Sequence, residues 1–257
     1  MTPSAGIRVA AAIAAALALA GACSSPTANM KKEAAARMEM GVTYLNQRNL
    51  PAAMRELTQA SALDPENPEI DMALGLAYQK RGDLGKAEEY MRDAIRKRPD
   101  YAEAHNNLGN VLSLQGKSRE AIREYEKAVG NVLYPTPEYG YYNMGREYAR
   151  LKDFGKAEIM YRRAVSLNGL YLDAYRDLAA VQAERGEWKE SANTLKRLVE
   201  VAPSFAPGWM DLGRLYLRVD RPGEALEAFR GAMANSEDSE VRREAARYIN
   251  LLERGKR

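Results

Sequence analysis

The sequence contains very little cysteine, histidine, phenylalanine and tryptophan. Its 257 residues include one Cys, one His, three Phe and two Trp. A single cysteine excludes a disulfide within the chain, and one cysteine with one histidine leaves too few ligands for a zinc cluster. The same scarcity removes the usual pairs for acid-base or nucleophilic catalysis. We therefore expect a protein that is not an enzyme and that holds neither a metal nor a soluble cofactor.

The charge has no strong preference for one sign. The chain has 38 Lys and Arg against 35 Asp and Glu, a formal net charge of +3. Without a broad basic field we expect no nucleic-acid partner. Tyrosine is abundant, with 15 residues, and Ala, Glu, Arg and Lys dominate the rest. These are strong helix formers, so the composition favours an all-helical fold.

The N-terminal residues have the pattern of a secretory signal peptide. Arg8 is the only charged residue before an apolar run over 9–20, and two small residues then precede Cys23. The run is shorter than the roughly 20 residues that span a bilayer as a helix. Residues 19–23 resemble a bacterial lipobox, which implies cleavage after residue 22 and a covalent lipid on Cys23. The alternative is an ordinary signal peptide followed by an incidental thiol.

The residues after Cys23 bear on where a lipid would hold the protein. Ser24 and Ser25 follow the cysteine without an Asp. This resembles lipoproteins sorted to the outer membrane, which implies a lipid-anchored protein facing the periplasm. We expect residues 23–33 to form the lipidated N-terminus and a short tether, whose roughly nine residues before the first helix reach about 30 Å when fully extended.

Small residues recur along the rest of the chain with a fixed period. Intervals of 34, 34, 36, 34 and 34 residues separate Gly41, Gly75, Gly109, Gly145, Ala179 and Gly213. A second small residue follows each of these twelve positions later, and Pro65, Pro99 and Pro203 end three units. This pattern resembles the tetratricopeptide consensus, which implies two packed helices per repeat and a right-handed solenoid with a concave groove.

The period sets the expected boundaries of six repeats and a cap. The signal peptide is predicted at 1–22, the repeat region at 34–239 and a C-terminal capping helix with its tail at 240–257. An interval of 36 residues and two prolines interrupt the period at 130–139. This leaves open a division into two halves of three repeats, although we expect one continuous solenoid. The predicted repeats are 34–67, 68–101, 102–135, 138–171, 172–205 and 206–239.

The groove of such a solenoid is lined by fixed positions of each first helix, and these positions differ along the chain. The early repeats place apolar residues there: Met38, Val42, Leu45, Met72 and Leu76. The third and fourth repeats place polar residues suited to a peptide backbone or a carboxylate. The alternative is that they only form a solvated inner face. The polar set is Asn106, Asn107, Asn110, Tyr142, Asn143 and Arg146.

Two other features have a structural interpretation. His105 stands where repeats four to six have Tyr141, Tyr175 and Trp209, so we expect it to pack without a carboxylate beside it. Some repeat proteins hold a C-terminal carboxylate with a clamp of Lys, Asn and Arg residues. Asp173 and Asp177 stand where the later cations of that clamp belong, which argues against it.

The combination of features resembles one family of envelope proteins. A lipobox, a short tether, six repeats and the junction Leu133-Tyr-Pro-Thr-Pro137 are similar to the type IV pilus biogenesis lipoproteins of the PilF/PilW/Tgl family. The resemblance implies a pilotin-like scaffold that binds secretin subunits and assists their multimerisation in the outer membrane. The alternative is a general periplasmic scaffold for an envelope or polysaccharide-export complex.

Overall fold

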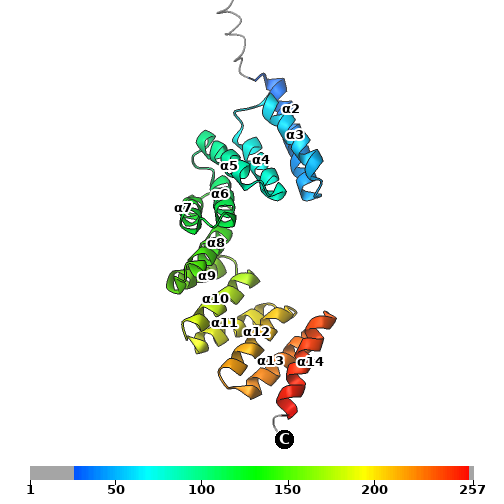
Figure 1. Cartoon of the computed structure of the whole chain (residues 1–257), viewed down its shortest axis with the longest axis vertical. Coiled ribbons are helices and arrows are strands. Elements are labelled where there is room, and N and C mark those ends of the chain that lie inside the picture. The colour runs from blue at the N-terminus through cyan, green and yellow to red at the C-terminus, as the bar shows by residue number, and fades with distance from the viewer. Residues whose placement is uncertain (1–25, 255–257) are drawn as a thin grey trace, which may run out of the picture. The chain divides into compact units, whose positions relative to one another are not determined.

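The computed structural model describes residues 26–254, so Cys23 and the predicted signal peptide at 1–22 lie outside the described residues. The described chain consists of helices joined by short turns and contains no strand, as predicted (Figure 1). Its thirteen helices are α2 (Ala28–Asn46), α3 (Leu50–Leu63), α4 (Pro68–Arg81), α5 (Leu84–Lys97), α6 (Ala102–Leu114), α7 (Ser118–Gly130), α8 (Pro137–Arg150), α9 (Phe154–Leu167), α10 (Leu172–Glu184), α11 (Trp188–Val201), α12 (Ala206–Arg218), α13 (Pro222–Asn235) and α14 (Ser239–Arg254).

The helices form two compact units. The first ends at Lys97 and contains α2 to α5, and the second begins at Arg98 and contains α6 to α14. The interruption at 130–139 therefore lies inside the second unit. The chain is not divided there into two halves of three repeats. Tyr134 is buried with Ala102 and Ala128, and the Asn131 side chain donates a 2.8 Å hydrogen bond to the Asp100 carbonyl. These contacts keep the longer junction packed.

In the five repeats that have a glycine at the repeated position, this glycine lies against one side chain of the second helix. A methyl group on Gly145 would lie 2.6 Å from Tyr161, and one on Gly109 would lie 2.5 Å from Tyr125. Leu57, Met91 and Phe229 lie in the same way against the glycines of their repeats. The contacting residue stands sixteen positions after the glycine in each case, because the second helix returns antiparallel past the glycine.

The first described helix starts earlier than the predicted repeat. Helix α2 begins at Ala28, because the Thr27 side chain accepts a hydrogen bond from the Met30 backbone N–H at 3.3 Å and caps the helix. The predicted tether at 23–33 therefore overlaps the helix. Only four residues separate Cys23 from Ala28. Bond geometry limits their reach to about 14 Å.

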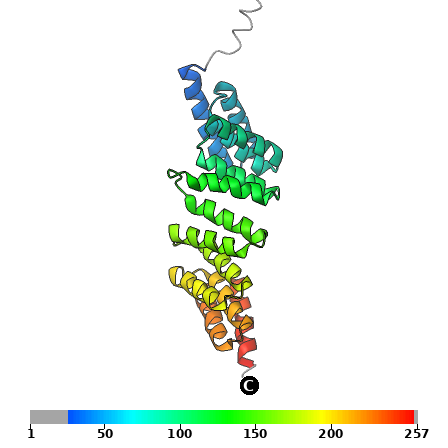
Figure 2. The same cartoon turned by 90° about the vertical axis from the view of Figure 1, so that its left-hand side faces the viewer.

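The last helix covers the open end of the second unit (Figure 2). Helix α14 buries Ala245 completely, and Tyr248 stacks on Phe229 of α13 with ring centres 4.3 Å apart. Val241, Ile249 and Leu252 pack against the same core. The predicted capping helix is confirmed, since its apolar face replaces the face that a further repeat would supply.

We predict that Gly145→Ala destabilises the second unit. The added methyl group must displace the large Tyr161 ring, and overpacking of this kind costs about 1–3 kcal/mol. A lower urea midpoint, followed by circular dichroism, would show the effect. The matched control is Gly155→Ala in the partner helix α9, where the nearest atom is 4.0 Å away. That variant should be neutral or slightly stabilising, because Ala favours a helix over Gly. Equal urea midpoints for both variants would contradict the close contact between Gly145 and Tyr161.

Candidate protein-binding face

Side chains of successive first helices contact one another along the second unit. We call this surface the first-helix face, formed by α6, α8, α10, α12 and α14. Asn143 on α8 bonds back to α6, Tyr142 bonds forward to Asp177 on α10, and Arg176 on α10 bonds to Asp211 on α12. Arg214 on α12 reaches Glu244 on α14 at 2.8 Å. A polar ladder therefore links all five helices.

The predicted asparagines form a cluster at one end of the ladder. The Asn143 amide donates to the Asn110 side-chain oxygen at 3.1 Å and to that of Asn106 at 3.4 Å. The buried Tyr125 hydroxyl donates to the same Asn110 oxygen at 2.9 Å. These three asparagines and Asn107 are half-buried, so their remaining amide groups face solvent. The buried Tyr125 holds the cluster in place, and the exposed amide groups remain available as donors and acceptors for a partner.

Tyr142 connects the asparagine cluster to an aromatic group. Its ring lies 4.7 Å from that of Tyr171 and 5.7 Å from that of Tyr161, and its hydroxyl donates to Asp177 at 3.0 Å. Burial raises the pKa of the Tyr142 phenol, and the Asp177 charge adds to this effect. Burial also raises the pKa of Asp177, against the opposing effects of the Tyr142 hydrogen bond and of Arg146.

Arg146 is the exposed cation of this region. Its guanidinium lies 5.9 Å from the centre of the Tyr142 ring and makes no ion pair with any described residue. By contrast, Arg176 and Arg214 are both paired with Asp211. Five N–H donors on a planar group suit a carboxylate, so Arg146 is well placed to receive an anionic group of a partner.

A hollow of about 380 Å³ opens between α10 and α12 on the first-helix face. Ala180 stands in the register of Arg146 and Arg214, so its short side chain leaves this space open. Arginines and aspartates rim the hollow over an apolar floor. Of the rim residues only Asp177 was noted from the sequence, although Asp211 and Arg214 follow Asp177 and Ala180 at the 34-residue period. The floor includes Ala183, Leu195 and Leu215.

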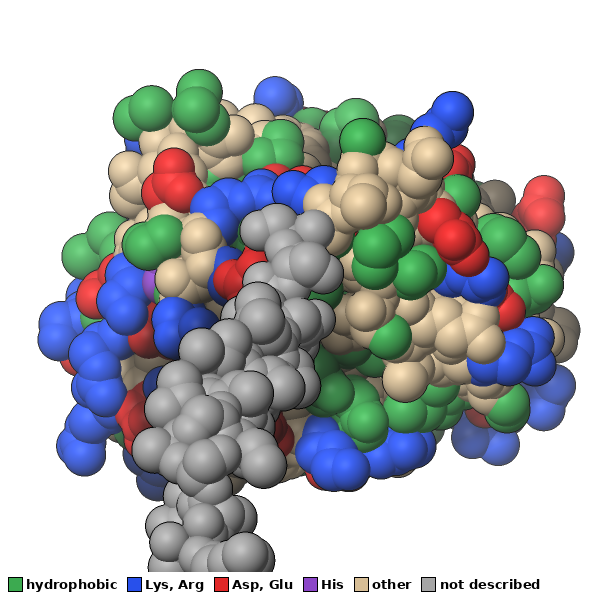
Figure 3. All heavy atoms as spheres, turned by 90° about the horizontal axis from the view of Figure 1, so that it is seen from above, with side chains coloured by type: hydrophobic (Ala, Val, Ile, Leu, Met, Phe, Trp, Pro, Cys, Tyr) green, Lys and Arg blue, Asp and Glu red, His purple; other side chains and the backbone are tan. Residues whose placement is uncertain are grey.

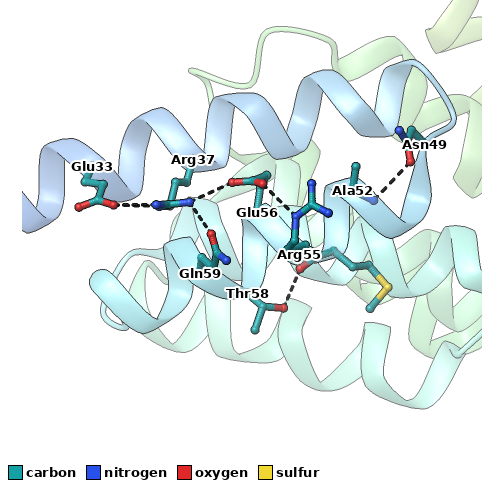
Figure 4. Close-up of polar contacts among 9 residues, drawn as sticks. Glu33, Arg37, Asn49, Ala52, Arg55, Glu56, Thr58 and Gln59 are labelled. Atoms are coloured by element: carbon teal, nitrogen blue, oxygen red, sulfur yellow. Dashed lines mark hydrogen bonds and ion pairs between the residues drawn. The ribbon is translucent and has the colours of Figure 1, made fainter.

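The first unit contains the apolar part of the predicted groove. Met38, Met72 and Leu76 are half-buried, and Val42 is 38% exposed. Leu45 was expected on the groove surface, but it is only 4% exposed and belongs to the core. Nearby, Arg37 on α2 bonds to Glu33 at 2.8 Å and to Glu56 on α3 at 3.1 Å (Figure 4). The Arg37–Glu56 ion pair joins the two helices beside this strip.

The expectation that no carboxylate lies beside His105 is wrong. Its Nδ1 lies 2.7 Å from Glu124, and its Nε2 donates to the Pro99 carbonyl at 3.0 Å. Burial disfavours ionisation of Glu124, but the bonds to His105 and Lys127 outweigh it and lower the pKa of this carboxyl. Trp209 donates in the same way to the carbonyl of Pro203, six residues earlier, at 2.9 Å. His105 therefore fastens a turn, and the contact with Glu124 adds to that packing role.

The surface and helices of the described chain add two observations. Acidic side chains lie among the basic ones on the face drawn in Figure 3, in keeping with the balanced composition. In residues 26–254, no helix combines the length and apolar character needed to cross a bilayer, and no cluster of His, Cys, Asp and Glu could hold a metal ion.

Comparison with known proteins identifies the repeats. A tetratricopeptide-repeat model matches residues 38–102, 72–136 and 181–240, and a second one matches 139–169. The chain belongs to the tetratricopeptide-repeat family. The predicted all-helical solenoid of tetratricopeptide repeats is thereby confirmed. Members of this family bind protein partners, so the first-helix face is the natural surface on which to look for one.

Two curated relatives share part of the chain. The CTR9 homolog of Arabidopsis thaliana is 28% identical over 207 residues, which are 77% of this chain and 19% of that protein. The type IV pilus assembly protein PilF of Pseudomonas aeruginosa is 26% identical over 133 residues, which are 52% of this chain and 53% of that protein. The chain thus spans between about a fifth and about half the length of these relatives.

Two solved structures cover more of the fold. The structure of Pseudomonas aeruginosa PilF superposes with a TM-score of 0.70 at 20% identity and covers 84% of this chain and 97% of that one. PilW, described as a widely conserved type IV pilus biogenesis factor, gives 0.68 at 23% identity and covers 79% and 93%. The protein is therefore a tetratricopeptide scaffold related to type IV pilus biogenesis factors, and the predicted family resemblance is confirmed.

We predict that Asp177→Asn makes stability less dependent on pH. Because the folded pKa of Asp177 is raised above the ordinary 3.8, its contribution to stability is present below that value and is lost as the pH rises through the folded pKa. Asparagine still accepts from Tyr142 but carries no charge. The gain in urea midpoint over the parent protein should be larger at pH 7 than at pH 3.5. A gain in urea midpoint that is equal at the two pH values would contradict the prediction.

Proposed function

We propose that the protein is a lipid-anchored scaffold that binds secretin subunits of a type IV pilus and assists their multimerisation in the outer membrane. The observation that carries this proposal is the first-helix face of the second unit, where fixed amides, an unpaired arginine and an apolar-floored hollow lie together. The likeness to PilF and PilW over most of the chain supports the choice of partner.

The first-helix face has the groups needed to hold an extended segment. Side-chain amides of Asn106, Asn110 and Asn143 each combine donors with an acceptor, which matches the alternating N–H and C=O groups of a peptide backbone. Arg146 supplies a charge for an acidic side chain or a chain end. The hollow beside Ala180 receives an apolar side chain of the partner. The preference for one partner sequence then comes from a few positions, while the amides bind the partner's backbone whatever its sequence.

The membrane anchor has a physical role in this proposal. A lipid on Cys23 would confine the scaffold to the thin layer in which membrane-bound secretin subunits lie. Each buried methylene contributes about 0.8 kcal/mol, so several acyl chains give a lasting hold. Confinement raises the effective concentration of the face against its partner, and a modest intrinsic affinity is then sufficient.

The amount of heat- and detergent-resistant secretin multimer in outer membranes tests the proposal. We expect cells without the protein to accumulate secretin monomer and to lose the multimer. Restoring the wild-type gene should restore the multimer. Unchanged multimer in the deleted cells would refute secretin assembly and would leave the general periplasmic scaffold for an envelope or polysaccharide-export complex as the better account.

Two variants separate the anchor from the face. Cys23→Ala should leave the protein folded but lower the multimer, because the scaffold is no longer confined to the membrane. Arg146→Glu should lower the multimer at normal scaffold levels, with a loss of affinity of about tenfold or more for one charge-assisted contact. Arg247→Glu, an exposed reversal on α14, is the matched control and should behave as wild type. Equal multimer with Arg146→Glu and Arg247→Glu would exclude Arg146 from the interface.

A further inference from the structure

The surface formed by the second helices contains hollows that repeat with the period of the chain. We call it the second-helix face. One hollow of about 450 Å³ lies between α9 and α11, and its lining includes Arg162, Tyr175, Leu178 and Arg197. A hollow of about 470 Å³ lies 34 residues further on, where the matching residues are Lys196, Trp209, Leu212 and Gly231. The two are successive copies of one inter-repeat site.

A third hollow of about 470 Å³ belongs to the same series. Its Tyr141, Ile159 and Arg163 precede Tyr175, Asn193 and Arg197 by one repeat, and it shares Arg162 with the middle hollow. The aromatic residue at the fourth position of each first helix forms a wall in all three hollows. The second-helix face therefore offers three depressions in a row, of which the one beside Tyr141 is formed by α8 and α9 alone.

The charge of the rim reverses along this row. The hollow of repeat four has two arginines, the middle hollow has two arginines and Glu190, and the hollow of repeat six has Lys196 against Glu200, Glu224 and Glu227. Several rim charges are paired within the chain: Arg162 with Glu158, Arg197 with Glu200, and Glu224 with Arg221. By contrast, Arg163 and Glu227 make no ion pair with any described residue. In repeat six the rim arginine is replaced by Gly231, which Trp209 covers: a methyl group there would lie 2.5 Å from the ring.

The row is basic at one end and acidic at the other. The rows of two copies of the chain are therefore complementary in charge when one copy is rotated by 180° relative to the other. A two-fold axis through the middle hollow places the repeat-four hollow of one copy against the repeat-six hollow of the other. Arg163 then meets Glu227 twice, once at each end of the row. Ile159 supplies an apolar side chain for the opposite hollow, since it is 60% exposed on the basic rim.

We propose that two copies of this chain pair antiparallel through the second-helix face. The pairing leaves both first-helix faces free, because no residue of the polar ladder lines any of the three hollows. The consequence rests on the proposed function: a dimer with two free binding faces holds two partner subunits together, and the second binding event gains from the effective concentration that the first creates. A dimeric scaffold therefore brings two partner subunits into contact with each other.

The mass of the full chain, extracted from membranes in mild detergent, tests the pairing. At about 100 µM we expect a dimer by sedimentation equilibrium, since a dissociation constant near 10 µM already gives mostly dimer at that concentration. Arg163→Glu should weaken dimerisation about tenfold or more, because like charges then face each other at both ends. Arg163→Glu combined with Glu227→Arg should restore the dimer. Arg247→Glu on α14 should leave it unchanged.

Cross-linking locates the axis. Asn193→Cys places a thiol in the middle hollow, and mild oxidation should give a covalent dimer, whereas Ile159→Cys alone should not, because its copies lie at opposite ends. A monomer at about 100 µM, or a double variant that stays monomeric, would overturn the antiparallel pairing. The mass is measured without secretin, so it is independent of the multimer assay: a dimer with normal secretin in deleted cells would refute only the proposed function.

Discussion

The close approach of the two helices within each repeat is the constraint on which the rest of the structure depends. A glycine on the first helix leaves only enough room for one side chain of the second, as with Gly145 and Tyr161. This contact fixes the angle and distance of the pair, and it does so again in each repeat that has the glycine. Because a single pair cannot bury its apolar faces, the repeats within each unit pack on one another, and α14 closes the C-terminal end of the second unit.

In the second unit, the two helices of a repeat form different surfaces when the repeats stack. The first helices lie close enough for side chains 33 to 37 residues apart to bond, as Asn143 does with Asn106 and Asn110 and as Tyr142 does with Asp177. The second helices enclose hollows between one repeat and the next. One periodic sequence thus produces two faces with different chemistry, a polar ladder and a row of pockets whose rim charge reverses along the chain.

Substitutions at equivalent positions are what make the faces specific. At one register of the first helices the chain places Asn110, Arg146, Ala180 and Arg214, and the short alanine is the place where a hollow opens. At one register of the second helices it places Arg163, Arg197 and Gly231. The glycine is where the rim lacks this arginine and Trp209 covers the surface. The repeat supplies the scaffold, and its departures from uniformity supply the sites.

The sequence by itself determined the helix content, the 34-residue repeat, the cap and the polar character of Asn106, Asn110 and Asn143, because periodic small and apolar residues dictate how helices pack on their neighbours. Only the tertiary structure decided which residue lies against each glycine, that Leu45 is core, that Glu124 lies beside His105, and that Asp211 joins Arg176 and Arg214. Those outcomes depend on the angle at which successive helices cross and on which of several long side chains makes the contact with a given partner. Spacing along the chain specifies neither of them.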